Sequence, residues 1–295
     1  LSENNIDKKI LEYVEKIRPD LGMYFALGEN HGFIEFIRAC NKLNIKTLQI
    51  VGNWDNLSAK NISIPSPHSL AVLSKQQKDF ASKIHGFPIK NIYVLGSKKY
   101  DNFFYLKNYE TKLNHKFKYI LFLEGWVWTD EEKTFNYLNN FIENERDFKN
   151  YKIIYRPHPL RSQNYNLINL NKYKNIIIDP QMKNAFQNRD FNLSNIPDEK
   201  YYISLIKDSE MVICGPTSMI LESIILEKKV LVLAFKSKKY YNNYNFIKNM
   251  INYDYIKNVP SIKINNSLDS LNEDILNLQK IELKDKYEAI TKCLD

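Results

Sequence analysis

Two short polar clusters in the second half of the chain have the residue types of an anion-binding site. Arg156-Pro157-His158-Pro159 follows a short apolar run, and Gly215-Pro216-Thr217-Ser218 follows another. Each proline fixes its own φ and favours extended geometry in the residue before it, so His158 is held in one direction. Arg156 and His158 can both donate hydrogen bonds to a phosphate oxygen. The alternative is a rigid loop that carries a surface histidine.

The second cluster leads from a predicted strand into a predicted helix. Backbone N–H groups at the start of a helix bind anions, and the hydroxyls of Thr217 and Ser218 add two more donors. Glu222 lies four residues after Ser218, on the same helix face, where its carboxylate can accept hydrogen bonds from a ribose diol. The alternative is an ordinary Ser/Thr helix cap followed by a solvated glutamate. Together the two clusters favour a site for a nucleotide monophosphate or diphosphate.

A parallel sheet is the element that can position both clusters. Short apolar runs alternate with helical periods along the chain, which is typical of βαβ units. We expect strands at 21–27, 46–51, 70–73, 92–95, 119–123, 152–155, 175–178, 211–214 and 230–235. Ligands of such folds bind at the carboxyl ends of the strands, and both clusters lie at such ends. Asp179, directly after Ile178, is a further candidate for the same reason.

The helical periods predict how the chain divides. We expect helices at 6–17 (ended by Pro19), 33–43, 75–84, 130–148 (capped by Asp130), 198–206, 219–226, 242–250 and 268–278. Residues 102–116 are aromatic and polar without a period, and we interpret them as a connection between domains. The chain then has a first domain at 1–113 and a second domain at 114–295. Both are expected to be Rossmann-like α/β domains, with a cleft between them.

The composition excludes several classes of protein. With 295 residues, 44% hydrophobic and 26% charged, the chain is neither disordered nor collagen-like. The net charge of +8 is spread along the sequence, so we expect no nucleic-acid partner. Three cysteines without a CxxC pair favour a reducing compartment, and no apolar stretch reaches the roughly 18 residues of a membrane span. We expect a cytoplasmic protein and leave open peripheral contact with the inner face of the membrane.

Several cofactor and metal motifs are absent from the sequence. It contains neither the GxxxxGK[ST] phosphate loop nor the GxGxxG dinucleotide fingerprint. Its five histidines are scattered, without an HExxH motif or a Cys/His cluster, and it has no convincing DxD pair. We therefore expect no metal and no cofactor.

The polar clusters also carry a family resemblance, which covers residues 118–235. RPHP after a strand, followed by DSEMVICGPTSMILESIILEKKVLVL, resembles the C-terminal half of GT-B glycosyltransferases. More narrowly it is similar to bacterial surface-polysaccharide transferases with an HP motif and a Ser/Thr pair: sialyltransferases, Kdo transferases and CDP-glycerol glycerophosphotransferases. The resemblance implies that His158, Thr217 and Ser218 hold the donor phosphate and that Glu222 binds ribose. It also implies that the first domain is shorter than in those enzymes. Either an N-terminal segment is missing from the sequence, or this protein has a reduced first domain.

The general base that deprotonates the acceptor hydroxyl is expected in the first domain. A glycosyl transfer with inversion needs a carboxylate or a histidine to take the proton of the acceptor hydroxyl. Candidates are Glu29 and His31, in the exit loop of the first strand, and Asp55, in the loop after the second. Asp55-Asn56 can instead be an Asx turn, and His31 an ordinary neighbour of a helix cap.

Glu124-Gly125 partly matches an acidic motif that sialyltransferase-like enzymes carry in their first domain. Here it ends the first strand of the second domain, and this departure leaves the identity of the base open. Gly125 can instead let the backbone approach the donor at the cleft. The predicted donor site therefore comprises Glu124, Gly125, Arg156, His158, Pro159, Asp179, Gly215, Thr217, Ser218 and Glu222.

These observations predict a glycosyltransferase that moves a sugar from a CMP-, UDP- or CDP-activated donor. The expected acceptor is a bacterial surface glycan, free or lipid-linked. A glycerol- or ribitol-phosphate transferase would need the same diphosphate site, and a non-hydrolysing sugar epimerase shares the fold. A non-catalytic basic binding module is the fourth hypothesis. No oligomeric state follows from the sequence.

Overall fold

The computed structural model divides the chain into two compact units. It describes residues 6–25, 31–59, 66–108, 113, 115–124, 130–158, 170–183, 198–235, 244–254 and 256–282, without the side chains of 31, 59 and 244–246. The first unit takes its described residues from 1–98 and 250–252, and the second from 99–249 and 253–290. Each unit is described by itself below.

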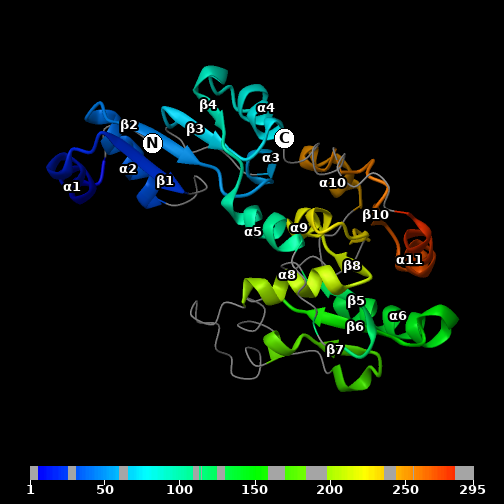
Figure 1. The fold of residues 1–295 in the computed structure, drawn as a ribbon. Helices are drawn as coiled ribbons and strands as arrows, with labels where there is room; N and C mark the ends of the chain where they lie inside the picture. Colours follow the sequence, from blue (N-terminus) through cyan, green and yellow to red (C-terminus); the bar gives the residue numbers. More distant parts are fainter. Residues whose placement is uncertain are drawn as a thin grey trace. The chain divides into compact units, whose positions relative to one another are not determined.

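Each unit is built on one parallel sheet (Figure 1). The order is β1-β2-β3-β4 in the first sheet and β10-β9-β8-β5-β6-β7 in the second, and all neighbouring strands are parallel. The strands are β1 Leu21–Phe25, β2 Lys46–Ile50, β3 Ser69–Val72, β4 Ile92–Val94, β5 Lys118–Leu123, β6 Tyr151–Arg156, β7 Ile176–Ile178, β8 Met211–Cys214, β9 Val230–Leu233 and β10 Ile262–Asn265. The predicted α/β class with two Rossmann-like sheets is confirmed.

The helices alternate with these strands. Their bounds are α1 Lys8–Ile17, α2 His31–Lys42, α3 Asn56–Ala59, α4 Lys75–Lys83, α5 Lys98–Lys107, α6 Glu131–Asn144, α8 Glu199–Asp208, α9 Met219–Ile225, α10 Tyr244–Asn249 and α11 Leu271–Lys280. The carboxylate of Asp130 accepts from the backbone N–H of Lys133, which confirms the predicted cap of α6. In the described part of the chain, no helix has both the length and the apolar character that crossing a bilayer requires.

The second sheet is doubly wound. The chain begins at the central strand β5, moves outward through β6 and β7, returns to the other side of β5 as β8, and continues to β9 and β10. The winding therefore reverses between β5 and β8, where sheets of this kind bind ligands at the carboxyl ends of their strands. Leu123 at the end of β5 pairs with Cys214 at the end of β8, so Glu124 and Gly215 both follow at this switch point.

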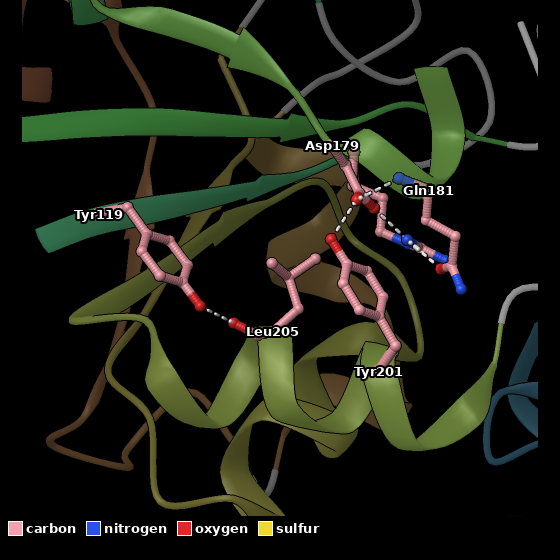
Figure 2. Close-up of polar contacts among 6 residues, drawn as sticks. Tyr119, Asp179, Gln181, Tyr201 and Leu205 are labelled. Carbon is pink, nitrogen blue, oxygen red and sulfur yellow. Dashed lines mark hydrogen bonds and ion pairs between the residues drawn. The ribbon is translucent and has the colours of Figure 1, made fainter. Parts of the chain in front are cut away.

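Helices cover both faces of the second sheet. On one face, Phe122 of β5 packs in a buried cluster with Phe135 of α6 and Ile275 of α11. On the other face, the hydroxyl of Tyr119 donates to the carbonyl of Leu205 in α8 at 2.8 Å (Figure 2). Because both faces are covered, β8 and β9 are buried at every residue, which explains their unbroken apolar runs.

Three segments differ from the sequence predictions. We expected residues 102–116 to have no regular structure. This prediction is wrong for residues 102–107, which belong to helix α5. Tyr100, Phe103 and Leu106 form its buried face at a spacing of three residues, a helical period that two aromatic rings carry. The helix belongs to the second unit from Lys99 onward, whereas the first domain was predicted to end at residue 113. The short helix α3 replaces part of the expected loop 52–60, and β10 was not predicted.

We predict that Gly22→Ala destabilises the first unit. A Cβ at this position would lie 2.9 Å from Cζ of Phe36 and 3.1 Å from Sγ of Cys40, so the Phe36 ring, or α2 with it, would have to shift away from β1. Overpacking of this kind costs about 1–3 kcal/mol, which urea denaturation would measure. Gly52→Ala is the control, because a Cβ there meets nothing within 4 Å. Equal stability of the two variants would contradict the close packing of α2 on β1.

Candidate functional site

Side chains at the carboxyl ends of β5 to β8 form two polar networks, one on each face of the sheet. Successive residues of a strand point to opposite faces. Tyr155 of β6 belongs to the buried cluster that includes α6, whereas Arg156 lies over the Tyr202 ring of α8. One strand end therefore contributes to both networks.

Arg156 is the centre of the network on the α8 face. Its Nη1 atom pairs with the carboxylate of Asp179 and donates to Oε1 of Gln181 at 3.0 Å. Its guanidinium carbon lies 4.8 Å from the centre of the Tyr202 ring. Asp179 is fully buried, and its second oxygen accepts from the Tyr201 hydroxyl at 2.7 Å and from the backbone N–H of Gln181 at 3.1 Å (Figure 2). Both carboxylate oxygens are thus engaged within the protein.

Glu222 of α9 extends this network to the switch point. Its Oε2 atom accepts from the hydroxyl of Tyr202 at 2.7 Å, and its Oε1 atom lies 2.9 Å from Nζ of Lys99. Burial and the neighbouring Glu222 carboxylate raise the pKa of Tyr202 well above its usual value, so the hydroxyl stays protonated and donates. Tyr202 therefore links the Arg156–Asp179 ion pair to Glu222, because its ring contacts Arg156 and its hydroxyl donates to Glu222.

The two hydroxyls that precede α9 have different partners. Oγ1 of Thr217 accepts from the backbone N–H of Met219 at 3.3 Å, whereas Glu222 is buried rather than solvated as the helix-cap alternative expected. Ser218 occupies the N-cap position without a side-chain cap bond, and its Oγ lies 3.4 Å from Nζ of Lys99. Of the predicted Ser/Thr pair, Ser218 is therefore the residue whose hydroxyl meets a cation.

Lys99 is a residue of this site that the sequence did not reveal. Its ammonium contacts both Ser218 and Glu222, and its side chain is 40% exposed, compared with 11% for Arg156. No sequence signal singled it out, because lysines are frequent along the chain and α5 was not predicted. It is the more accessible of these two cations.

On the α6 face, Glu124 and Glu131 share one tyrosine hydroxyl. The hydroxyl oxygen of Tyr155 lies 2.6 Å from Oε2 of Glu124 and 2.6 Å from Oε1 of Glu131, and both carboxyls are buried. A hydroxyl has one proton and can donate it to one acceptor. We infer that the other carboxyl makes the second contact as a protonated donor, so that the cluster would hold one proton more than two ionised glutamates.

His158 follows β6 and is half-buried. Burial lowers the pKa of its imidazole, and the negative charge of Glu124 partly offsets this effect. The ring is therefore mostly neutral at pH 7. A bound anion would favour the protonated form.

Asp55 lies in the first unit, between β2 and α3. Its backbone carbonyl accepts from the N–H of Ser58 at 3.3 Å, and its carboxylate lies 3.4 Å from Nδ2 of Asn56. Nε2 of Gln77 in α4 donates to the carbonyl of Asn53 at 2.7 Å and so fixes the loop. These contacts describe a turn that opens α3, and a role for Asp55 as a base stays a prediction.

The remaining predicted positions contribute less to the site. Glu29, Gly125 and Pro159 lie outside the described residues, and His31 is the first residue of α2. Gly215 is buried directly after β8. The described residues include no group of three or more His, Cys, Asp or Glu side chains that could hold a metal ion, and metal independence stays a prediction.

Comparisons with known proteins identify the fold. The chain matches no protein-family model and no curated protein. Among similar solved structures are a UDP-GlcNAc 2-epimerase from Methanocaldococcus jannaschii (14% identity, 97% of this chain and 77% of that chain, TM-score 0.56) and S. aureus MnaA with UDP (12%, 99% and 74%, 0.57). Another is MurG from Acinetobacter baumannii (11%, 96% and 72%, 0.53). At these identities the likeness concerns the fold, and the chain has the two Rossmann-like domains of the GT-B fold.

We predict that Asp179→Asn destabilises the second unit by about 3 kcal/mol. The substitution leaves the mostly buried guanidinium of Arg156 without its carboxylate, and an uncompensated buried charge is costly. Urea denaturation at pH 7 would measure the loss. Glu132→Gln is the control, since it removes an exposed ion pair with Lys172 and should leave stability nearly unchanged. A loss as small as that of the control would show that the buried pair is dispensable.

A second prediction concerns the proton shared by Glu124, Tyr155 and Glu131. In Glu131→Gln, the amide can donate to the tyrosine oxygen and Tyr155 can donate to Glu124, so no carboxyl needs a proton. The infrared difference spectrum between wild type and this variant at neutral pH should show the loss of one protonated-carboxyl C=O band. Glu143→Gln, which removes a carboxylate bonded to Asn139 in the same helix, should show no such loss. If Glu131→Gln and Glu143→Gln give the same difference spectrum against wild type, the shared proton is refuted.

Proposed function

We propose that the second unit binds a nucleotide-activated sugar at the switch point of its sheet and that the protein is a GT-B glycosyltransferase. The observation that carries the proposal is the position of two hydrogen-bonding groups after the strands that flank β5, with a lysine in contact with one of them. Ser218 follows β8, His158 follows β6, and Lys99 contacts Ser218. All three are of the types that bind phosphate.

The donor phosphate is assigned to Ser218, Lys99 and His158. Arg156, which the sequence favoured for this role, already has Asp179 and Gln181 on Nη1 and Tyr202 against its guanidinium. We assign Arg156 to holding Tyr202 and α8 in place. Glu222 is assigned to the ribose, as the family resemblance implies.

These assignments suit the chemistry of sugar transfer. When the bond between the anomeric carbon and the phosphate oxygen breaks, the electron pair stays on the phosphate, where negative charge accumulates. Donors placed at that oxygen stabilise this charge, and we propose the side chains of Ser218, Lys99 and His158 for this role. We further propose a bacterial surface glycan as acceptor, with Asp55 the described candidate for taking its hydroxyl proton.

A sugar-nucleotide epimerase is the second candidate function. It is favoured by the similarity to solved structures of UDP-GlcNAc 2-epimerases. An epimerase would change the sugar of a UDP-sugar without any acceptor, whereas a transferase needs one. Mass spectrometry of the products from UDP-sugars, CMP-sugars and CDP-glycerol would separate these two functions from a polyol-phosphate transferase.

The proposal predicts that at least one of CMP, CDP, UDP and GDP stabilises the protein in a thermal-shift panel. A ligand that binds the folded state alone raises Tm with its concentration. If none of the four raises Tm, the proposed nucleotide site is refuted. The stabilisation should also increase as the pH falls from 8 to 6, because an anion binds imidazolium better than neutral imidazole and the pKa of His158 lies below its usual 6.5.

His158→Gln is the matched variant for the pH effect. It keeps a hydrogen-bond donor but cannot titrate, so nucleotide stabilisation should persist with a smaller dependence on pH. Titration of the nucleotide phosphate is the same for both proteins and cancels in the comparison. An unchanged pH dependence in the variant would remove His158 from the phosphate site.

A further inference from the structure

We propose that, when the donor binds, the ammonium of Lys99 moves from the Glu222 carboxylate to the donor phosphate. The ribose hydroxyls then bind the Glu222 carboxylate in place of Lys99. The inference rests on the proposed function and deepens it, because it names a residue that couples recognition of the ribose to recognition of the phosphate. It also gives Glu222 two successive partners instead of one.

The two oxygens of Glu222 have unequal partners. Oε2 is bound at 2.7 Å by Tyr202, whose ring contacts both Arg156 and the ring of Phe103. Oε1 is bound at 2.9 Å by Lys99, whose long side chain is partly exposed. A ribose diol that approaches this carboxylate therefore competes with Lys99 for Oε1 rather than with Tyr202 for Oε2.

The released ammonium has a second position at hand. Oγ of Ser218 lies 3.4 Å from Nζ of Lys99, at the switch point where the phosphate is assigned. A lysine ammonium is a compact charge on a flexible stem, so it can move by a few ångströms without a shift of α5. Lys99 can therefore pass from Glu222 to a phosphate oxygen beside Ser218.

The two exchanges depend on each other. The Glu222 side chain is 6% exposed, and a buried carboxylate that loses its cation without a replacement is strongly disfavoured. The ribose hydroxyls supply that replacement, and the phosphate gives the ammonium a new anion. A nucleoside alone would have to displace Lys99 without this compensation, whereas a nucleotide provides both partners.

Arg156 cannot make the same exchange. Its planar guanidinium is held by a fully buried carboxylate, by Gln181 and by the face of Tyr202. Its partners come from two different segments, so moving it would disturb both α8 and the turn after β7. Among the cations of this network, the geometry therefore singles out Lys99.

The test compares affinity for a nucleotide with affinity for its nucleoside. NMR titration would use CMP and cytidine, UDP and uridine, and GDP and guanosine with wild type and with Lys99→Met. We expect the substitution to weaken the nucleotide roughly tenfold, the usual effect of losing one charge-assisted hydrogen bond. Nucleoside affinity should be equal or higher, because Lys99 no longer competes for Oε1. The preference for nucleotide over nucleoside should therefore fall roughly tenfold.

Two further variants control for effects on folding. Lys107→Met removes an ion pair of the same type on the same helix, between Nζ of Lys107 and Oε1 of Glu227 at 2.6 Å, and should leave the preference unchanged. Lys99→Arg keeps the charge and should retain most of the preference. If Lys99→Met keeps the wild-type preference, or weakens both ligands equally, the exchange is refuted while the proposed function stands. If wild type binds none of the nucleotides, both are refuted.

Discussion

The buried ion pair between Arg156 and Asp179 is the interaction on which the polar end of the second sheet depends. A carboxylate with no solvent contact must find all its partners in the protein, and Asp179 finds them in β6, in α8 and in its own turn after β7. The pair thus fixes α8 against the carboxyl ends of β6 and β7. The position of α8 then sets Tyr202, and Tyr202 sets one oxygen of Glu222.

The sheet also keeps two kinds of polar chemistry apart. The α6 face holds the two glutamates that share the Tyr155 hydroxyl, and the α8 face holds the Arg156 and Glu222 clusters. Beyond the strand ends, the charge of Glu124 on the α6 face also acts on His158. The alternation of side chains along β6 creates this separation, since neighbouring residues 155 and 156 belong to different networks.

Much of the fold could be predicted from the sequence, because a strand that is covered on both faces must be apolar throughout. The runs at 211–214 and 230–233 show this plainly, and the polar clusters after the strands were placed correctly at their ends. The partners of those clusters could not be predicted. Asp179 lies 23 residues after Arg156, and its role depends on the register of β6 and β7 and on where α8 packs. Lys99 was missed because the helix that carries it, α5, was not predicted. The buried face of α5 consists mainly of aromatic residues and does not show the usual aliphatic period.

The pairing of charges at the strand ends has a consequence for how the site would recruit a ligand. In the described residues, Arg156 is matched by Asp179 and Lys99 by Glu222, and the two glutamates on the α6 face are the pair inferred to share a proton. The chain has a net charge of +8, yet these residues sum to about one negative charge. A phosphate site built from these residues would offer little long-range attraction, so its selectivity would depend on hydrogen bonds formed at contact distance. The rate of encounter would then respond weakly to ionic strength, unlike that of a protein that captures its anion through an open basic surface.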